Sequence, residues 1–388
     1  MTDHPVAERA KPIHEQPDPA TIDPAKTDPE HADRGGHDLH HHGDVEARGA
    51  QLDFAVNVVP GQPAFLREVL HAEVENVAAY PDEQPARLAL AAHLGVDPRS
   101  VLLVNGAAEA FTLIARVRQW RRPLVVHPQF TEPEAALLAA GRTPARLVLR
   151  ESDGFALTPE DVAALIAGES DLVVVGNPTN PTSRLHDPAL LRRWAGSLKG
   201  GERVTVVDEA FMDVVAEPSR SLVPEAARTQ GLLVLRSLTK TFALAGIRAG
   251  YVVGHPDLVA ELRAIQPPWS VNSLALAATR ASATEQADRY VRQVVGLLEQ
   301  WRPHLVAGLT ARGWEVVAQS RAPFVLARHP DAERLRLALR EKGIAVRRGD
   351  TFPGLDPTWA RFALRPAQPT DALLAALDTL SDTVGGAH

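Results

Sequence analysis

The sequence of 388 residues contains no cysteine, which excludes disulfide bonds and thiolate metal sites and is compatible with a reducing cytoplasm. It has no run of about 20 apolar residues, so we expect neither a membrane-spanning helix nor a membrane partner. Positive charge is not in excess: 41 basic residues stand against 48 acidic ones, a net charge of −7, which gives no electrostatic case for nucleic acid. The first residues, Met1-Thr-Asp-His-Pro, lack a secretory signal. These absences predict a cytoplasmic protein.

Residues 1–43 lack aromatic side chains, are rich in Pro, Asp and Glu, and hold seven of the fifteen histidines. Such a segment buries too little apolar area to offset its ordering entropy, so we expect a largely disordered tail. Within it, HDLHHHGD (37–44) has the composition of a metal site, or of a metal carrier to which an enzyme is attached. Adjacent histidines in a flexible chain do not converge on one ion, so we predict no metal site.

From Leu52 onward, short apolar or β-branched runs alternate with helical patterns. Seven such runs fall between residues 100 and 254: 100–104, 123–127, 146–150, 171–175, 204–207, 232–236 and 249–254. The helical patterns between them include 108–117, 132–140 and 159–168. Nearly continuous apolar strands that alternate with helices indicate an α/β fold, with a mostly parallel seven-stranded sheet covered on both faces.

The last part of the chain has a different pattern. A helical stretch rich in Ala, Leu and Arg runs from Asn272 to Gly313. Mixed strand-like and helical units follow it, at 322–328, 334–343, 344–348, 361–365 and 371–380. This order predicts a smaller α+β domain at the C-terminus. A chain of this length is long for one core, which agrees with two compact regions.

Polar and aromatic residues follow the ends of several predicted strands, where ligands bind in open α/β sheets. Asn105-Gly106-Ala107-Ala108 opens a helix whose free backbone N–H groups suit a phosphate, although a plain strand-to-helix turn looks the same. Phe130 is either an aromatic ring at the sheet edge or ordinary core. NPTNPTS (177–183) forms a rigid turn whose side-chain amides can face a ligand.

Two charged residues stand at the ends of later strands. Asp208 directly follows four apolar or β-branched residues, so it needs a cationic partner, which is either an arginine or a protonated ring nitrogen. Lys240 lies between two threonines in an apolar setting, eight positions before Arg248. It is either an exposed lysine on a short helix or a lysine kept reactive by burial.

Taken as one set, these groups match what pyridoxal 5′-phosphate needs. Its aldehyde reacts with a lysine. Its phosphate needs N–H groups, hydroxyls and an arginine. Its ring nitrogen stays protonated only beside a carboxylate, and protonation makes the ring an electron sink.

Three motifs also carry a resemblance to a known family. SLTKTFALAGIRAGY (237–251) is similar to the cofactor-lysine segment of the fold-type I, aspartate-aminotransferase-like enzymes that use pyridoxal phosphate. NPTNPTS is similar to their Asn-Pro-x-Asn-Pro-Thr-Gly turn, and VVDEAF (206–211) to their Asp-x-Ala-Tyr strand end. The resemblance covers about residues 52–380 and implies the three-layer fold of these transferases. It also implies a large cofactor-binding domain at 80–270, a small domain at 271–388, and an N-terminal segment at 44–79 that packs with the small domain.

The resemblance implies a role for each matching residue. Lys240 binds the cofactor's aldehyde and then transfers protons, Asp208 pairs with the ring nitrogen, and Asn180 bonds the ring O3′. Phe130 stacks on the ring, and Arg361 binds the substrate α-carboxylate through a two-point contact. The other cofactor contacts that the resemblance implies are Ala107, Ala108, Ser237, Thr239, Arg248 and, across the interface of a homodimer with composite sites, Tyr80.

Within the family, the likeness is greatest to histidinol-phosphate aminotransferases and to the L-threonine-O-3-phosphate decarboxylases of cobalamin synthesis. GIAVRRGDTFPGLDPTWARFALR (343–365) resembles the decarboxylases more, and its Arg347, Arg348 and Arg365 are expected to hold a substrate phosphate. HHHGDVEARG (40–49) resembles a His-x-Gly-Asp segment near the active-site mouth of this group, which implies that part of the histidine run is ordered. We therefore expect a decarboxylase of a small phosphorylated amino acid or amine. The alternative is a transaminase that uses a keto-acid acceptor.

Two positions depart from the family pattern. Phe211 replaces a tyrosine and so removes a phenol that would bond O3′. Ser183 replaces a glycine, which reaches positive φ far more readily. Neither departure removes an element that the chemistry requires. A cofactor-binding scaffold that has lost its activity is a further alternative, but Lys240 and Asp208 are both present, which disfavours it.

Overall fold

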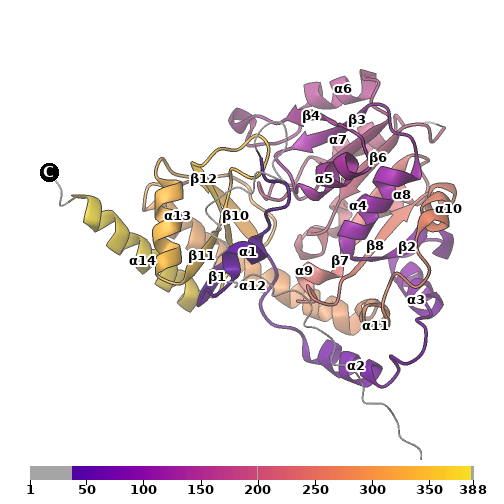
Figure 1. The fold of residues 1–388 in the computed structure, drawn as a ribbon, viewed down its shortest axis with the longest axis horizontal. Helices are drawn as coiled ribbons and strands as arrows, with labels where there is room; N and C mark the ends of the chain where they lie inside the picture. Colours follow the sequence, from indigo (N-terminus) through magenta and orange to yellow (C-terminus); the bar gives the residue numbers. More distant parts are fainter. Residues whose placement is uncertain (1–36, 199, 386–388) are drawn as a thin grey trace, which may run out of the picture.

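The computed structural model describes residues 37–198 and 200–385, which form two lobes, each built on one β-sheet (Figure 1). The sheet of the large lobe has seven strands in the order β2-β8-β7-β6-β5-β3-β4. Its strands are β2 (Val101–Asn105), β3 (Pro123–His127), β4 (Ala145–Val148), β5 (Leu172–Gly176), β6 (Val204–Asp208), β7 (Leu232–Ser237) and β8 (Ala249–Gly254). Only β8 runs antiparallel to its neighbours in this sheet, so the predicted α/β class with a mostly parallel seven-stranded sheet is confirmed.

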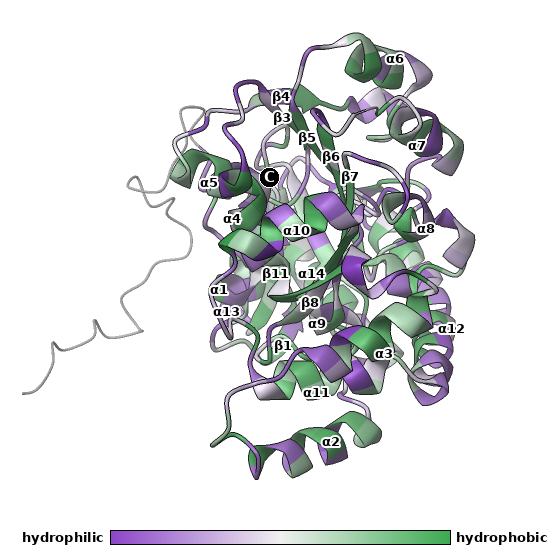
Figure 2. Ribbon diagram, turned by 90° about the vertical axis from the view of Figure 1, so that its right-hand side faces the viewer, coloured by the Kyte–Doolittle hydropathy of each residue, from purple (hydrophilic) through white to green (hydrophobic). Residues whose placement is uncertain are grey.

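The strands of this sheet are apolar along their whole length because both faces are covered. In β2, Leu102 and Val104 belong to one buried cluster, whereas Val101 and Leu103 belong to another on the opposite face. In Figure 2 the strands of this sheet are coloured hydrophobic, whereas the helices around them carry both hydrophobic and hydrophilic residues. The helices of this lobe include α4 (Gly106–Val117), α5 (Glu132–Ala139), α6 (Pro159–Ala167), α7 (Pro188–Ala195), α8 (Val223–Ala226), α9 (Leu238–Thr241) and α10 (Pro256–Ile265).

The small lobe is a five-stranded sheet in the order β1-β11-β12-β10-β9, with helices packed against it. Its elements are β1 (Leu52–Phe54), β9 (Glu315–Val316), β10 (Phe324–Arg328), α13 (Ala332–Glu341), β11 (Ile344–Arg348), β12 (Trp359–Ala363) and α14 (Ala367–Gly385). The long helix α12 (Glu285–Thr310) contributes Ala287 to the large-lobe core and Leu305 to the small-lobe core. It therefore joins the two lobes, as Figure 1 shows.

The boundaries expected for the N-terminal segment and the small domain need correction. Strand β1 does pair with β11, but α2 (Ala64–Val74) packs against α11 (Ser273–Ser282), and its Leu66 and Leu70 enter the large-lobe core. Helix α11 was expected in the small domain, and it too belongs to the large lobe, beside α3 (Gln84–Leu94). The reason is tertiary: the apolar stripe of α2 has no partner within its own segment and is buried by α11.

The described chain begins with a packed segment, residues 37–47, which we call the mouth segment. Leu39 is 2% exposed, and its carbonyl accepts a hydrogen bond from Thr131 Oγ1 at 2.6 Å. The short helix α1 (Gly43–Ala47) carries Glu46, whose buried carboxylate contacts His41 Nε2 at 3.1 Å and Arg336 Nη1 at 3.1 Å. The expectation of a disordered tail to residue 43 is therefore wrong for 37–43, because a charge network and an apolar side chain hold it. Its remainder, 1–36, lies outside the described residues.

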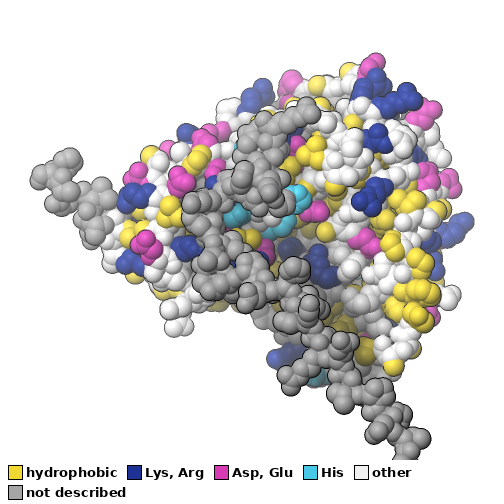
Figure 3. All heavy atoms as spheres, viewed as in Figure 1, with side chains coloured by type: hydrophobic (Ala, Val, Ile, Leu, Met, Phe, Trp, Pro, Cys, Tyr) yellow, Lys and Arg dark blue, Asp and Glu magenta, His cyan; other side chains and the backbone are white. Residues whose placement is uncertain are grey.

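The mouth segment connects the lobes, because Thr131 belongs to the large lobe and Arg336 lies on α13. Figure 3 shows histidine side chains gathered near the centre of the face where the lobes meet. No cluster of three or more His, Asp or Glu side chains within the described ranges is arranged to hold a metal ion. Among the same residues, no helix combines the length and apolarity needed to cross a membrane.

Candidate active site

A cavity of about 520 Å³ lies between the lobes, beyond the carboxyl ends of β5, β6 and β7. All but three of the site residues expected from the sequence line it. They are Ala107, Ala108, Phe130, Asn180, Asp208, Ser237, Thr239, Lys240, Arg248, Arg347 and Arg361. The chain thus brings residues up to 254 positions apart into one site, from both lobes. Tyr80, Arg348 and Arg365 lie outside the cavity.

Lys240 stands on α9, the single turn of helix that follows β7, and reaches the cavity. Burial, together with repulsion from Arg361 and Arg248, lowers its pKa to about 8, and attraction to Asp208 only partly opposes this. A substantial fraction of the amine is therefore neutral near pH 8, and a neutral amine is nucleophilic. Of the two interpretations from the sequence, the structure supports the reactive lysine, because Lys240 is half-buried and its pKa is lowered.

Asp208 ends β6 and faces the same cavity. Its Oδ1 accepts a hydrogen bond from the Ala210 N–H at 3.0 Å, yet burial raises its pKa to about 6 against this bond and against Lys240. The next residue, Glu209, points away and pairs with Arg236 at 3.1 Å. The nearby arginine, Arg236, therefore pairs with Glu209 and not with Asp208. A cationic N–H placed against Asp208 would stabilise its charged form.

The turn between β2 and α4 forms an anion cradle. Gly106 has φ +73°, and a Cβ built there would lie 2.7 Å from Arg248 Nη2, so glycine is what lets this guanidinium lie over the helix N-terminus. Likewise, a Cβ on Gly250 would lie 3.3 Å from the Ala107 nitrogen. Ser237 Oγ and Thr239 Oγ1 lie 2.7 Å apart beside them. Backbone N–H groups, two hydroxyls and a guanidinium therefore converge, which suits a phosphate dianion.

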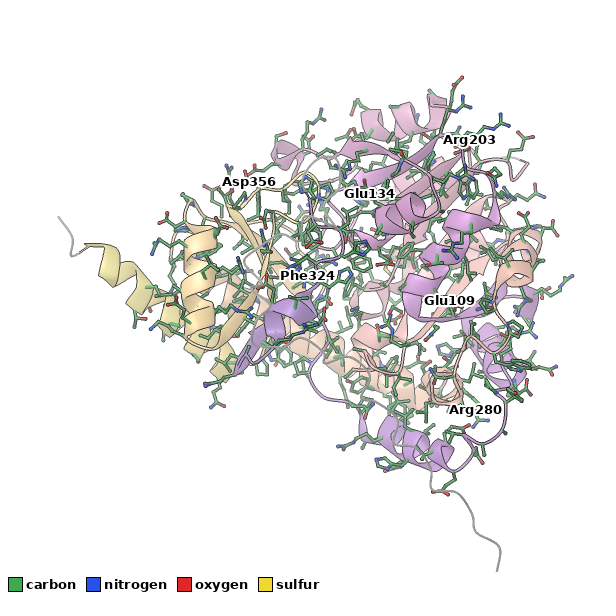
Figure 4. All side chains as sticks on the ribbon, viewed as in Figure 1. Glu109, Glu134, Arg203, Arg280, Phe324 and Asp356 are labelled. Carbon is green, nitrogen blue, oxygen red and sulfur yellow. The ribbon has the colours of Figure 1, made fainter. Side chains whose placement is uncertain are left out.

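Arg361 and Asn180 meet across the lobes. The Arg361 Nη1 donates to Asn180 Oδ1, its Nη2 donates to the Ala55 carbonyl, and its guanidinium lies 5.1 Å from the centre of the Phe324 ring. Figure 4 labels Phe324 where the small-lobe strands face the large lobe. Burial, together with repulsion from Arg347, lowers the pKa of Arg361 well below its ordinary value. Its buried Nε has no hydrogen-bond partner among the described residues, so a donor remains for a ligand.

Arg347 is held at the cavity wall by the mouth segment. Its Nη2 donates to the His41 carbonyl at 2.7 Å and to Thr351 Oγ1 at 2.6 Å, and its guanidinium lies 4.7 Å from the Phe352 ring centre. Burial lowers its pKa to about 10. Arg347 and Arg361 are directly opposite each other in the β11–β12 pairing, so both reach the same face.

Two other arginines do not reach the cavity. Arg348 is engaged by Asp350, with Nε 2.6 Å from Oδ1. Arg365 donates to the carbonyls of Asp53 at 2.7 Å and Val56 at 2.6 Å. The expectation that these arginines hold a substrate phosphate is not met, because neither lines the cavity. Arg365 instead holds the chain that follows β1.

Tyr80 is also away from this cavity. It is 78% exposed, and its ring stacks on Trp269 with ring centres 4.4 Å apart. A role in the cavity of the same chain is thus excluded by distance in the fold, whereas the predicted role across a dimer interface stays a prediction.

Three further residues line the cavity: His42 and Asp44, which lie in the segment that the resemblance placed near the active-site mouth, and Glu132, which was not expected from the sequence. Burial lowers the pKa of His42 to about 4, so its ring is neutral at pH 7, and burial raises the pKa of Glu132. The ring of His42 lies 5.6 Å from that of Phe130. No motif marks Glu132, because only the packing of the mouth segment over α5 makes it part of the wall.

The family model for "Aminotransferase class I and II" matches residues 50–380. The chain belongs to this family. Its cofactor is pyridoxal 5′-phosphate, and three features fit that group: the anion cradle, the half-buried carboxylate of Asp208, and the lowered pKa of Lys240.

Relatives of this chain carry two different activities in their names. A histidinol-phosphate aminotransferase of Mycobacterium tuberculosis is 43% identical over 341 residues, 87% of this chain and 89% of the relative. A threonine-phosphate decarboxylase of Salmonella typhimurium is 32% identical over 340 residues, 84% of this chain and 90% of the relative. Among solved structures, a histidinol-phosphate aminotransferase of Clostridium acetobutylicum has a TM-score of 0.78 at 26% identity, covering 86% of this chain and 99% of its own.

Replacing Lys240 by methionine should stabilise the cofactor-free protein. Burial lowers the lysine's pKa from 10.5 to about 8, so the folded protein disfavours the charged amine. The resulting loss of folding free energy is greatest below pH 8, and it disappears as the pH rises toward 10.5. We expect Lys240→Met to raise the free energy of unfolding by about 1–3 kcal/mol at pH 7 and to have little effect above pH 10.5. Thermal unfolding of both proteins across this pH range measures it. Lys342→Met, at an exposed lysine, is the control. If the two variants change the free energy of unfolding equally at every pH, the lowered pKa of Lys240 is contradicted.

Adding a methyl group to the anion cradle should weaken cofactor binding. Gly106→Ala forces a side chain into positive φ and against Arg248, so we expect about a tenfold weaker affinity for pyridoxal phosphate. Absorbance titration of the cofactor measures the dissociation constant. Gly246→Ala is the matched control, because nothing lies within 4 Å of a Cβ there. If both variants bind the cofactor like the wild type, the cradle is elsewhere.

Proposed function

We propose that the cavity residues divide into a cofactor set and a substrate set. Arg248, with Ser237, Thr239 and the N–H groups of Ala107 and Ala108, would hold the cofactor's phosphate. Asp208 would hold the protonated ring nitrogen, Asn180 the ring oxygen and Phe130 the ring face. The support for this division is the convergence of these groups and their fit to the chemistry of each part. When bound, the cofactor withdraws electrons from the substrate Cα.

Lys240 would then work at the substrate Cα. Its lowered pKa lets it exchange a proton near neutral pH, which a general base and acid must do. Arg361 would bind a carboxylate with its free donors, and its contact with Asn180 sets where that carboxylate sits relative to the cofactor site. The neutral His42 and the mouth segment would limit the access of water.

The observation that carries the substrate class is the pair of guanidinium groups on neighbouring strands. Arg347 and Arg361 face the cavity side by side, apart from Arg248 in the cofactor cradle. Two buried cations require anionic groups to offset their repulsion, so the substrate should be anionic and small enough for the space that the cofactor leaves. A phosphorylated amine or amino acid meets this requirement, because a phosphate matches the geometry of a guanidinium.

For the reaction, transamination now stands ahead of the decarboxylation that we expected from the sequence. The relatives at 43% identity are named aminotransferases, and the same arginine pair can bind a phosphorylated donor in one half-reaction and a dicarboxylate acceptor in the other. We infer a transaminase of the histidinol-phosphate type, with a keto acid as acceptor.

One observation favours the second candidate, the L-threonine-O-3-phosphate decarboxylase. Histidinol phosphate has a phosphate but no carboxylate, whereas phosphothreonine has both and would engage Arg347 and Arg361 at once. The packed mouth segment, which holds Arg347 through the His41 carbonyl, contains the motif that resembles the decarboxylases. A relative of that name is 32% identical.

We also propose a homodimer in which Tyr80 contributes to the partner's site. The exposed stack of Tyr80 on Trp269 supports this, because two adjacent exposed aromatic rings form an apolar surface of the kind found at protein–protein contacts.

Product analysis by mass spectrometry decides between the two reactions. Cofactor-loaded protein is incubated either with histidinol phosphate and 2-oxoglutarate, or with L-threonine O-3-phosphate alone. We expect catalytic formation of glutamate in the first mixture and no aminopropanol phosphate in the second, because a transaminase breaks the Cα–H bond. Catalytic release of aminopropanol phosphate without an acceptor would instead establish the decarboxylase.

The same assay tests the arginine pair. Arg347→Gln should lower kcat/KM for the phosphorylated substrate about 100-fold, because it removes a charged donor from a buried anion site. Arg348→Gln, at the next residue and outside the cavity, is the matched control. Equal losses in the two variants would contradict the phosphate site, whichever reaction is observed.

A further inference from the structure

Ser183, where the family has glycine, closes the turn that carries Asn180. Its φ is +61°, a conformation that a side chain disfavours, and it is fully buried. The Ser183 N–H donates to the Thr179 carbonyl at 2.7 Å, and the Thr179 N–H donates to the Arg184 carbonyl at 2.9 Å. The turn is therefore held within the large lobe by its own backbone, and the hydroxyl of Ser183 is left for another purpose.

That hydroxyl accepts two hydrogen bonds from the small lobe. The N–H groups of Arg321 and Ala322 point at Ser183 Oγ, at 3.0 and 2.7 Å. The Arg321 N–H also donates to the Ser183 carbonyl at 2.9 Å. Among the described residues, the Ala322 N–H donates to the Ser183 hydroxyl alone. Ala322 is fully buried, so removing the hydroxyl would leave its N–H without a partner.

The segment that Ser183 holds leads into the strands that bear Arg361. Ala322 precedes β10, in which Phe324 stacks under the Arg361 guanidinium and Leu326 is the register partner of Arg361 in β12. Two connections therefore link Asn180 to Arg361. One is their direct side-chain hydrogen bond, and the other runs through Ser183 and β10.

We propose that Ser183 is a positioning residue that fixes the small-lobe strands against the Asn180 turn and so sets where Arg361 presents its donors to a carboxylate. A glycine would adopt the same backbone with less strain but could not make these bonds. The serine thus has a strained backbone conformation, but its hydroxyl fixes the position of one lobe relative to the other. This inference rests on the carboxylate role proposed for Arg361 and not on which reaction follows.

Two substitutions test this role in the cofactor-loaded protein. Ser183→Ala removes the hydroxyl and keeps the strained φ, whereas Ser183→Gly removes the hydroxyl and relieves the strain. The probe is succinate, a dicarboxylate that undergoes no turnover, and its binding is followed through the absorbance of the bound cofactor. We expect both variants to bind succinate about fivefold more weakly, with an unchanged dissociation constant for pyridoxal phosphate.

The control is Ser320→Ala, which removes a buried hydroxyl that bonds within the small lobe, to the Val317 carbonyl at 3.0 Å. It should lower the thermal unfolding midpoint without changing succinate binding. If Ser183→Ala does not fold, Ser183→Gly still carries the test. Succinate binding equal to wild type in the Ser183 variants, whatever their unfolding midpoint, would overturn the inference. Failure of the wild type itself to bind succinate would contradict the role of Arg361 instead.

Discussion

The crowding of positive charge around one cavity is the constraint on which the rest of this structure depends. Lys240, Arg248, Arg347 and Arg361 all face it, and burial lowers the pKa of three of them. Such an arrangement is unfavourable in isolation, because the buried Arg347 and Arg361 lose water and the four cations repel one another. It becomes favourable when anions fill the cavity. The cofactor's phosphate and an anionic substrate supply that negative charge, so their binding offsets the repulsion between the cations.

The fold serves this constraint by bringing two sheets to one gap. The parallel strands of the large lobe deliver Asp208 and Lys240 at their carboxyl ends, and β11 and β12 of the small lobe deliver the arginine pair. Neither lobe forms the site alone. The mouth segment and the Ser183 turn both connect the lobes. The mouth segment contacts Arg347 directly, through the His41 carbonyl. The Ser183 turn acts on Arg361 through β10, whose Leu326 pairs with Arg361 in the sheet.

The large-lobe half of the site was predictable because its signals are local. A buried strand that ends in Asp208, and a lysine directly after the next strand, are each contained within a few residues, and parallel strands bring such ends together. The small-lobe half was predicted only through the family resemblance, which implied Arg347 and Arg361 but also Arg348 and Arg365, and the last two do not reach the cavity. Arg365 looks like Arg361 in sequence, but carbonyls more than 300 positions away, after β1, engage it. The packing of 37–43 and of α2 also depends on distant partners, as does the hydroxyl of Ser183, 139 positions from Ala322.

The most direct test of this account is to find which lysine carries the cofactor. The bond between cofactor and protein is trapped by reduction with borohydride, and the digested protein is mapped by mass spectrometry. The chain has five lysines: Lys11, Lys26, Lys199, Lys240 and Lys342. We predict that the cofactor's mass appears on the peptide containing Lys240 and on no other. Modification of a different lysine, or of none, would contradict it.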